Sequence, residues 1–124
     1  VSSAASDVYK RQSLGLLNGS KEENIEKGLY SKFYMHRIGH WLGMDVHDVG
    51  AYKKDGDWRE LEKGMVMTIE PGIYILDSLK DVDDKWKGIG VRIEDNIVIN
   101  DSGNEFLTPD VPRTIEEVEQ TVQG

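Results

Sequence analysis

Apolar and polar residues alternate through residues 90–100, and this alternation is the strongest constraint on the fold. Successive side chains of a β-strand point to opposite faces, so the odd and even positions of the run lie on different sides. The apolar side consists of Val91, Ile93, Ile97 and Ile99. Arg92 and Glu94 point the other way, and Asp95 interrupts the apolar side. The pattern predicts a half-buried strand.

Turn signals place further strands around this one. An apolar run over residues 64–71 predicts a strand that stops at Pro71, and residues 73–76 continue it. The turn sequence Asn-Asp-Ser-Gly at 100–103 should fold residues 105–108 back as a hairpin partner. The polar residues 53–60 predict a surface loop, and the acidic stretch 77–87 predicts a longer one.

Two capping boxes predict helices. Ser20 with Glu23 opens one helix, expected over residues 20–34, because Ile25, Leu29 and Phe33 recur every four residues. Thr114 with Glu117 opens a short final helix. The predicted fold class is α+β, with helices flanking an antiparallel sheet.

The first twelve residues are set apart from this fold. They have no hydrophobic period, and residues 7–12 resemble the translation of a transposase adapter used in sequencing libraries. We expect residues 1–12 to be a non-native, adapter-derived or disordered segment, and residues 13–124 to form the domain.

Composition excludes several classes of protein. A chain of 124 residues with 38% hydrophobic residues is of a size for one domain. The net charge of −8 argues against nucleic acid or an anionic membrane as partner. The chain has no cysteine, which rules out a disulfide and a thiolate metal site, and no apolar run approaches the length of a membrane span. We expect a cytoplasmic protein.

All three histidines lie within residues 36–50, among glycines that argue against a helix there. Strand parity places Glu70 on the face shared by Val66 and Thr68, so Glu70 and Glu94 converge near His40 if their strands pair. Two carboxylates that close repel each other unless a cation lies between them. One imidazole with two carboxylates suits a catalytic zinc site, Mn²⁺ or a two-metal centre, and spacing alone does not choose.

The motifs resemble those of a known family. The run His36-Arg-Ile-Gly-His40-Trp-Leu-Gly-Met-Asp-Val-His47-Asp-Val-Gly is followed by Glu70-Pro-Gly-Ile-Tyr74 and by Gly-Val-Arg92-Ile-Glu94-Asp. Together they resemble the C-terminal catalytic half of the Xaa-Pro aminopeptidases, also called aminopeptidase P. The resemblance implies part of a metallopeptidase catalytic domain with the pita-bread fold, a curved antiparallel sheet with flanking helices.

The resemblance also implies roles for individual residues. His40, Glu70 and Glu94 become metal ligands, with Glu94 bridging two divalent ions, Mn²⁺ before Co²⁺ or Zn²⁺. His36, His47 and Arg92 become catalytic and substrate-binding residues. Tyr74 becomes a further substrate-binding residue, and Tyr74 and Arg92 orient the groups around them. The implied substrate is a peptide with proline in second position, and the implied parent protein is a homo-oligomer.

The chain departs from the family pattern at one point. The family centre also uses two aspartates from upstream motifs, and nothing before His36 matches them. We therefore expect weak metal binding and little activity from this chain as written. Four alternatives stay open. Two are enzymes: a prolidase that cleaves Xaa-Pro dipeptides, and a methionine aminopeptidase, whose corresponding segment differs. The third is a non-catalytic pita-bread domain that binds other proteins, and the fourth is a truncated, poorly folded piece that aggregates or dimerises through exposed apolar faces.

Overall fold

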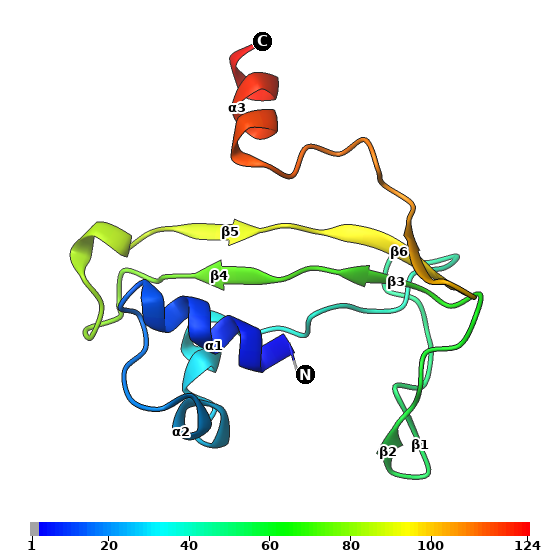
Figure 1. Ribbon diagram of the computed structural model, residues 1–124, viewed down its shortest axis with the longest axis horizontal. Helices are drawn as coiled ribbons and strands as arrows, with labels where there is room; N and C mark the ends of the chain where they lie inside the picture. Colours follow the sequence, from blue (N-terminus) through cyan, green and yellow to red (C-terminus); the bar gives the residue numbers. More distant parts are fainter. Residues whose placement is uncertain (1–2) are drawn as a thin grey trace. The chain divides into compact units, whose positions relative to one another are not determined.

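A computed structural model describes residues 3–124, which form short helices and antiparallel strands (Figure 1). The helices are α1 (Ser3–Ser13), α2 (Lys21–Glu26), the 3-10 helices η1 (Leu29–Phe33) and η2 (Asp84–Trp86), and α3 (Ile115–Gln123). The strands are β1 (Lys53–Lys54), β2 (Asp57–Trp58), β3 (Val66–Ile69), β4 (Gly72–Tyr74), β5 (Gly90–Arg92), β6 (Asp95–Asn100) and β7 (Gly103–Phe106). The α+β prediction is confirmed.

The chain divides into two compact units, each made of two separate stretches of sequence. The first unit contains the chain up to Arg37 together with Gly72–Arg92. The second contains Ile38–Pro71 and Ile93–Gly124. The described part of the first unit carries the helices α1, α2, η1 and η2 and the pair β4–β5, and the second unit carries the sheet β3–β6–β7, the hairpin β1–β2 and α3.

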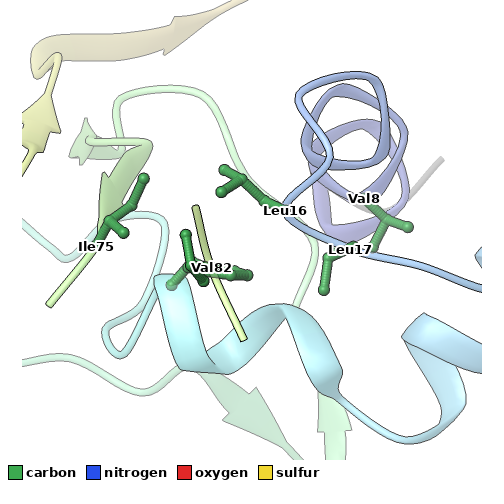
Figure 2. Packing of buried hydrophobic residues seen from close by; sticks show 6 residues of the cluster. Val8, Leu16, Leu17, Ile75 and Val82 are labelled. Carbon is green, nitrogen blue, oxygen red and sulfur yellow. The ribbon is translucent and has the colours of Figure 1, made fainter. Parts of the chain in front are cut away.

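An apolar core holds the first unit together. Its buried members are Val8, Leu16, Leu17, Phe33, Ile75 and Val82. Figure 2 shows side chains from α1, from the loop after it and from the segment after β4 gathered in this core. Full burial of one such side chain contributes about 1.5–3 kcal/mol, so this cluster is the main source of stability for the unit.

Residues 1–12 differ from expectation in the part that the structure describes. From Ser3 onward they form α1, and Val8 on this helix is fully buried. Arg11, one turn further along the same face, is 4% exposed and donates to the carbonyl oxygens of Tyr30 (2.9 Å) and Gly72 (3.2 Å). Tertiary packing thus orders a segment without a hydrophobic period of its own, whereas its foreign origin stays a prediction.

The predicted helix over residues 20–34 begins where expected but is too long. Ser20 is the N-cap, and its hydroxyl accepts from the N–H of Glu23 (3.1 Å). The helix ends at Glu26 because Gly28 adopts a left-handed conformation (φ 60°), which an α-helix cannot continue through. The chain then resumes as η1.

The three-stranded sheet of the second unit follows the predicted pattern. β3 pairs with β6 and β6 with β7, all antiparallel. The β6–β7 turn places Asn100 opposite Gly103, so the hairpin forms at the predicted turn but its second strand starts earlier than residue 105. The expected surface loop 53–60 contains the short exposed hairpin β1–β2, closed by a two-residue turn.

The final helix carries the predicted capping box. The Thr114 hydroxyl accepts from the N–H of Glu117 (3.2 Å), and the Glu117 carboxylate accepts from the N–H of Thr114 (3.0 Å). Across residues 3–124, every helix is too short or too polar to cross a membrane.

Candidate metal centre

His40 lies beside β3, in a stretch that pairs with this strand through backbone hydrogen bonds. The N–H of Thr68 donates to the carbonyl oxygen of His40 (2.9 Å), and the N–H of Glu70 donates to that of Ile38 (2.7 Å). The approach is close at Gly39, where a Cβ would lie 1.9 Å from the Thr68 carbonyl oxygen. Only glycine allows this pairing, which sets His40 opposite Thr68.

Glu70 and Glu94 stand at the ends of two paired strands. β3 ends at Ile69 and β6 begins at Asp95, and these two residues are opposite each other in the ladder. The residue after Ile69 is therefore brought beside the residue before Asp95. The strand predicted over 90–100 is divided at this point, since residues 93 and 94 lie between β5 and β6. Glu70 is 7% exposed, whereas Glu94 is exposed.

The three predicted ligands lie together. One ligand atom from each of His40, Glu70 and Glu94 is within 4.8 Å of the other two. His40 Nε2 and Glu70 Oε1 are 3.4 Å apart. Ligand atoms about 2.0–2.2 Å from one cation are about 3–4 Å apart, so a divalent ion needs at most a small closure of this cluster. Within residues 3–124 this is the one group of three or more potential metal-binding side chains that meets so closely.

The hydrogen bonding of the His40 ring leaves the lone pair of Nε2 available to bind a metal. Its Nδ1 lies 3.0 Å from the carbonyl oxygen of Trp41. A carbonyl oxygen only accepts, so Nδ1 carries the proton and the neutral ring keeps a lone pair on Nε2, the atom that faces Glu70. Such a backbone partner on the second nitrogen is typical of metal-binding histidines.

Thr68 orients both ligands, a role that sequence reasoning missed. Its side chain is 1% exposed, and its hydroxyl accepts from the N–H of His40 (3.0 Å). The hydroxyl proton is then directed to Glu70 Oε1 (3.1 Å). Strand parity places Thr68 on the same face as Glu70. A hydroxyl two residues before a carboxylate on a buried face is therefore the sequence feature that could have identified this hydrogen bond.

His47 lies next to His40 but outside the three-residue cluster. The two imidazole rings are 4.4 Å apart between centroids and tilted by 50°. His47 is exposed and lies in an irregular loop. As predicted, the histidine segment, residues 36–50, is not helical.

The remaining predicted residues belong to the first unit. His36 Nδ1 lies 2.8 Å from the carbonyl oxygen of Arg37, so Nδ1 donates, and Nε2 of the neutral ring accepts from the Tyr74 hydroxyl (2.8 Å). Arg92 is exposed on β5, opposite Gly72 of β4. The structure thus joins His36 to Tyr74 directly.

Asp95, which interrupts the apolar side of its strand, has a specific partner. Nε of Arg113 donates to both of its carboxylate oxygens (2.7 and 2.9 Å). These hydrogen bonds hold the pKa of Asp95 below its usual range, and the carboxylate raises the pKa of Arg113. Sequence reasoning did not connect these two residues, which are 18 positions apart.

The donor set fits a divalent cation: one imidazole lone pair and two carboxylates are present, one of them buried. Three side chains are few for two ions, and within the described residues no aspartate joins this cluster.

The chain matches metallopeptidase family M24 over residues 1–101. It is 54% identical over 106 residues to the Xaa-Pro aminopeptidase of Haemophilus influenzae, covering 86% of this chain and 24% of that protein. It is 39% identical over 139 residues to human Xaa-Pro dipeptidase, covering 90% of this chain and 28% of that protein. The chain therefore spans about a quarter of the length of the curated relatives it matches.

Solved structures show the same relation. The Pseudomonas aeruginosa aminopeptidase PepP matches with a TM-score of 0.93 and 52% identity, over 97% of this chain and 27% of that one. Zinc-substituted Escherichia coli aminopeptidase P in complex with product matches with a TM-score of 0.87 and 46% identity, over 94% of this chain and 26% of that one. The predicted fold is confirmed, and the chain belongs to metallopeptidase family M24, with the pita-bread fold of aminopeptidase P.

Proposed function

We propose that this chain supplies the metal-binding part of an Xaa-Pro aminopeptidase, which releases the N-terminal residue from peptides with proline in second position. The observation that carries the proposal is the meeting of His40, Glu70 and Glu94 within 4.8 Å. The identity to the Haemophilus influenzae aminopeptidase, 54%, exceeds that to human Xaa-Pro dipeptidase, 39%, and this favours the aminopeptidase over the dipeptidase.

The proposed cofactor is a pair of divalent ions, Mn²⁺ before Co²⁺ or Zn²⁺. His40, Glu70 and Glu94 would hold these ions. Bound there, such ions supply Lewis acidity and lower the pKa of a water molecule, which makes a nucleophile available near neutral pH. Thr68 keeps the Glu70 carboxylate turned toward His40 through its hydrogen bond.

Proton transfer and substrate binding fall to other side chains of this chain. His47, exposed and beside His40, binds the peptide and donates a proton where negative charge develops on the carbonyl oxygen. His36 binds the substrate, and the hydrogen bond that its Nε2 accepts from the Tyr74 hydroxyl fixes its ring in one orientation. Arg92 orients neighbouring groups. We further infer that the parent protein works in the cytoplasm as a homo-oligomer.

The metal site is tested by titrating the chain with Co²⁺ and with Mn²⁺ in a calorimeter. We expect His40→Ala, Glu70→Gln and Glu94→Gln each to weaken binding at least tenfold. Glu105→Gln, on the exposed strand β7, is the matched control and should bind as the unaltered chain does. Unchanged affinity in the three variants would contradict the site. Tight uptake of two Mn²⁺ per chain would contradict our expectation that this chain alone binds weakly.

The activity is tested on the full-length protein that contains this chain. An aminopeptidase should release the first residue of Xaa-Pro-Xaa tripeptides, whereas a prolidase should cleave Xaa-Pro dipeptides and leave tripeptides intact. A protein that binds metal tightly and cleaves neither would be a non-catalytic binding domain.

A further inference from the structure

We propose that Arg113 is a positioning residue for the metal centre, which acts by binding Asp95 and so fixes the backbone that carries Glu94. The inference rests on the proposed function, because it takes Glu94 to be a metal ligand. It extends that proposal to a part of the chain, the approach to α3, in which sequence reasoning found only a helix cap.

The contact between the two residues is a fork. Besides the two bonds from Nε, the terminal Nη2 of Arg113 also donates to Asp95 Oδ1. The Thr108 hydroxyl donates to the same oxygen (3.2 Å). The Asp95 side chain is 12% exposed, so this carboxylate is held from several directions in a place that water hardly reaches. Bidentate arginine–carboxylate pairs are directional as well as strong.

The guanidinium is itself fixed by the chain around it. Its Nη1 donates to the carbonyl oxygens of Pro109 (3.0 Å) and Val111 (3.0 Å), and its Nη2 donates to that of Thr108. Arg113 also lies over the Phe106 ring, 5.2 Å from its centroid. The segment after β7 thus wraps around the guanidinium and presents it to Asp95 in one geometry.

The position of Asp95 connects this contact to the metal ligands. Asp95 follows Glu94 directly and is opposite Ile69, the residue before Glu70. Glu94 is exposed and lies between β5 and β6 along the chain. Removing Arg113 leaves a nearly buried carboxylate without its charged partner, on the side of β6 that also carries Ile97. An unpaired charge there is strongly unfavourable, and the start of β6 must turn to expose it, taking Glu94 along.

The test compares Arg113→Gln, Arg113→Lys and Lys63→Gln. Lys63 forms an exposed ion pair with Asp101, just beyond the other end of β6, and is the matched control. Each substitution is made in the full-length protein that contains this chain, which is titrated with Co²⁺ in a calorimeter. The amide resonances of residues 93–96 are compared by NMR without metal. We expect Arg113→Gln to weaken Co²⁺ binding about tenfold and to shift these resonances. Arg113→Lys should recover only part of the affinity, because a lysine keeps the charge but not the fork. Lys63→Gln should change neither.

The outcomes separate this inference from the proposed function. If the full-length protein that contains this chain binds no Co²⁺, the metal site is refuted and this inference with it. If it binds Co²⁺ and Arg113→Gln binds equally or more tightly, only the role of Arg113 is refuted. Full recovery in Arg113→Lys would show that charge rather than geometry matters, which also overturns the proposal. If Arg113→Gln does not fold, Arg113→Lys decides: affinity and resonances equal to those of the unaltered chain count against the proposal.

Discussion

Replacing Thr68 with valine removes the one hydroxyl that connects two of the proposed ligands and keeps nearly the same shape. The change leaves the N–H of His40 without its side-chain acceptor in a partly buried position, which costs about 1–3 kcal/mol. It also removes a hydrogen bond to the Glu70 carboxylate, worth about 1.5–3 kcal/mol. The added methyl group returns about 1 kcal/mol of hydrophobic stabilisation. The expected net loss is about 2–5 kcal/mol in the free energy of unfolding.

Metal binding should fall as well. Without the Thr68 hydroxyl, Glu70 loses the hydrogen bond that turns its carboxylate toward His40 Nε2. Loss of such an orienting partner typically weakens metal binding ten- to a hundredfold. The assay combines urea unfolding, followed by tryptophan fluorescence, with a Co²⁺ titration of the folded protein. Trp41, next to His40, is nearly buried, so its fluorescence should report unfolding of the segment that pairs with β3.

Thr68→Ser is the matched control. Serine keeps the hydroxyl and loses one methyl group, so it should cost about 1 kcal/mol of stability and leave Co²⁺ affinity unchanged. If Thr68→Val binds Co²⁺ as tightly as the unaltered chain, the hydroxyl does not orient the site. If Thr68→Ser loses as much affinity as Thr68→Val, the methyl group and its packing are responsible, and the reasoning from hydrogen bonds is wrong.

Two further predictions follow from the backbone and the C-terminal helix. Gly39→Ala should lower the free energy of unfolding by about 3 kcal/mol or more in a urea titration, since its Cβ would meet a backbone oxygen at 1.9 Å. Gly90→Ala, whose Cβ would make an ordinary contact at 3.5 Å, should be nearly neutral, and equal losses in both would contradict this reason. The pKa of Glu117 is lowered because the N–H groups of Thr114 and Arg113 donate to its carboxylate. These bonds therefore stabilise α3 at any pH above about 4.3, the pKa of glutamate in the unfolded chain. The stabilisation is lost as the pH falls through the pKa of Glu117 in the folded chain. A carboxyl carbon titration of Glu117 by NMR checks this, and a midpoint at or above 4.3 would refute it.

Local signals were the part of the fold that sequence could predict. The caps at Ser20 and Thr114 and the turn before Gly103 depend on residues within four positions of one another, and each is present. The helix after Ser20 was predicted too long, because its apolar period continues past Gly28 while the backbone does not. A glycine within a helix costs only about 1 kcal/mol relative to alanine. Its presence in the sequence therefore does not rule out a helix that the spacing of apolar residues predicts.

Long-range partners were the part that sequence could not predict. Val8 is the buried apolar residue of a segment without periodicity, and only the core of the first unit explains its burial. Asp95 interrupts an apolar strand face for no reason visible in the sequence, and only its ion pair with Arg113 explains it. Parity and family motifs predicted that His40, Glu70 and Glu94 meet, but the hydrogen bonds that aim them depend on side-chain orientation, which no spacing encodes.

The two acidic ligands are supported in different ways, and this follows from where regular pairing stops. Pro71 has no N–H to donate, so β3 ends just before it and Glu70 is left at a strand end that is still buried. A buried carboxylate needs a donor, and Thr68 provides one from the same face. Glu94 is exposed, so water can solvate its carboxylate. Its backbone is fixed through its neighbour, because the fork from Arg113 holds Asp95. The site therefore joins one ligand held at its carboxylate to another held through its backbone, and substitutions at Thr68 and Arg113 should weaken metal binding independently.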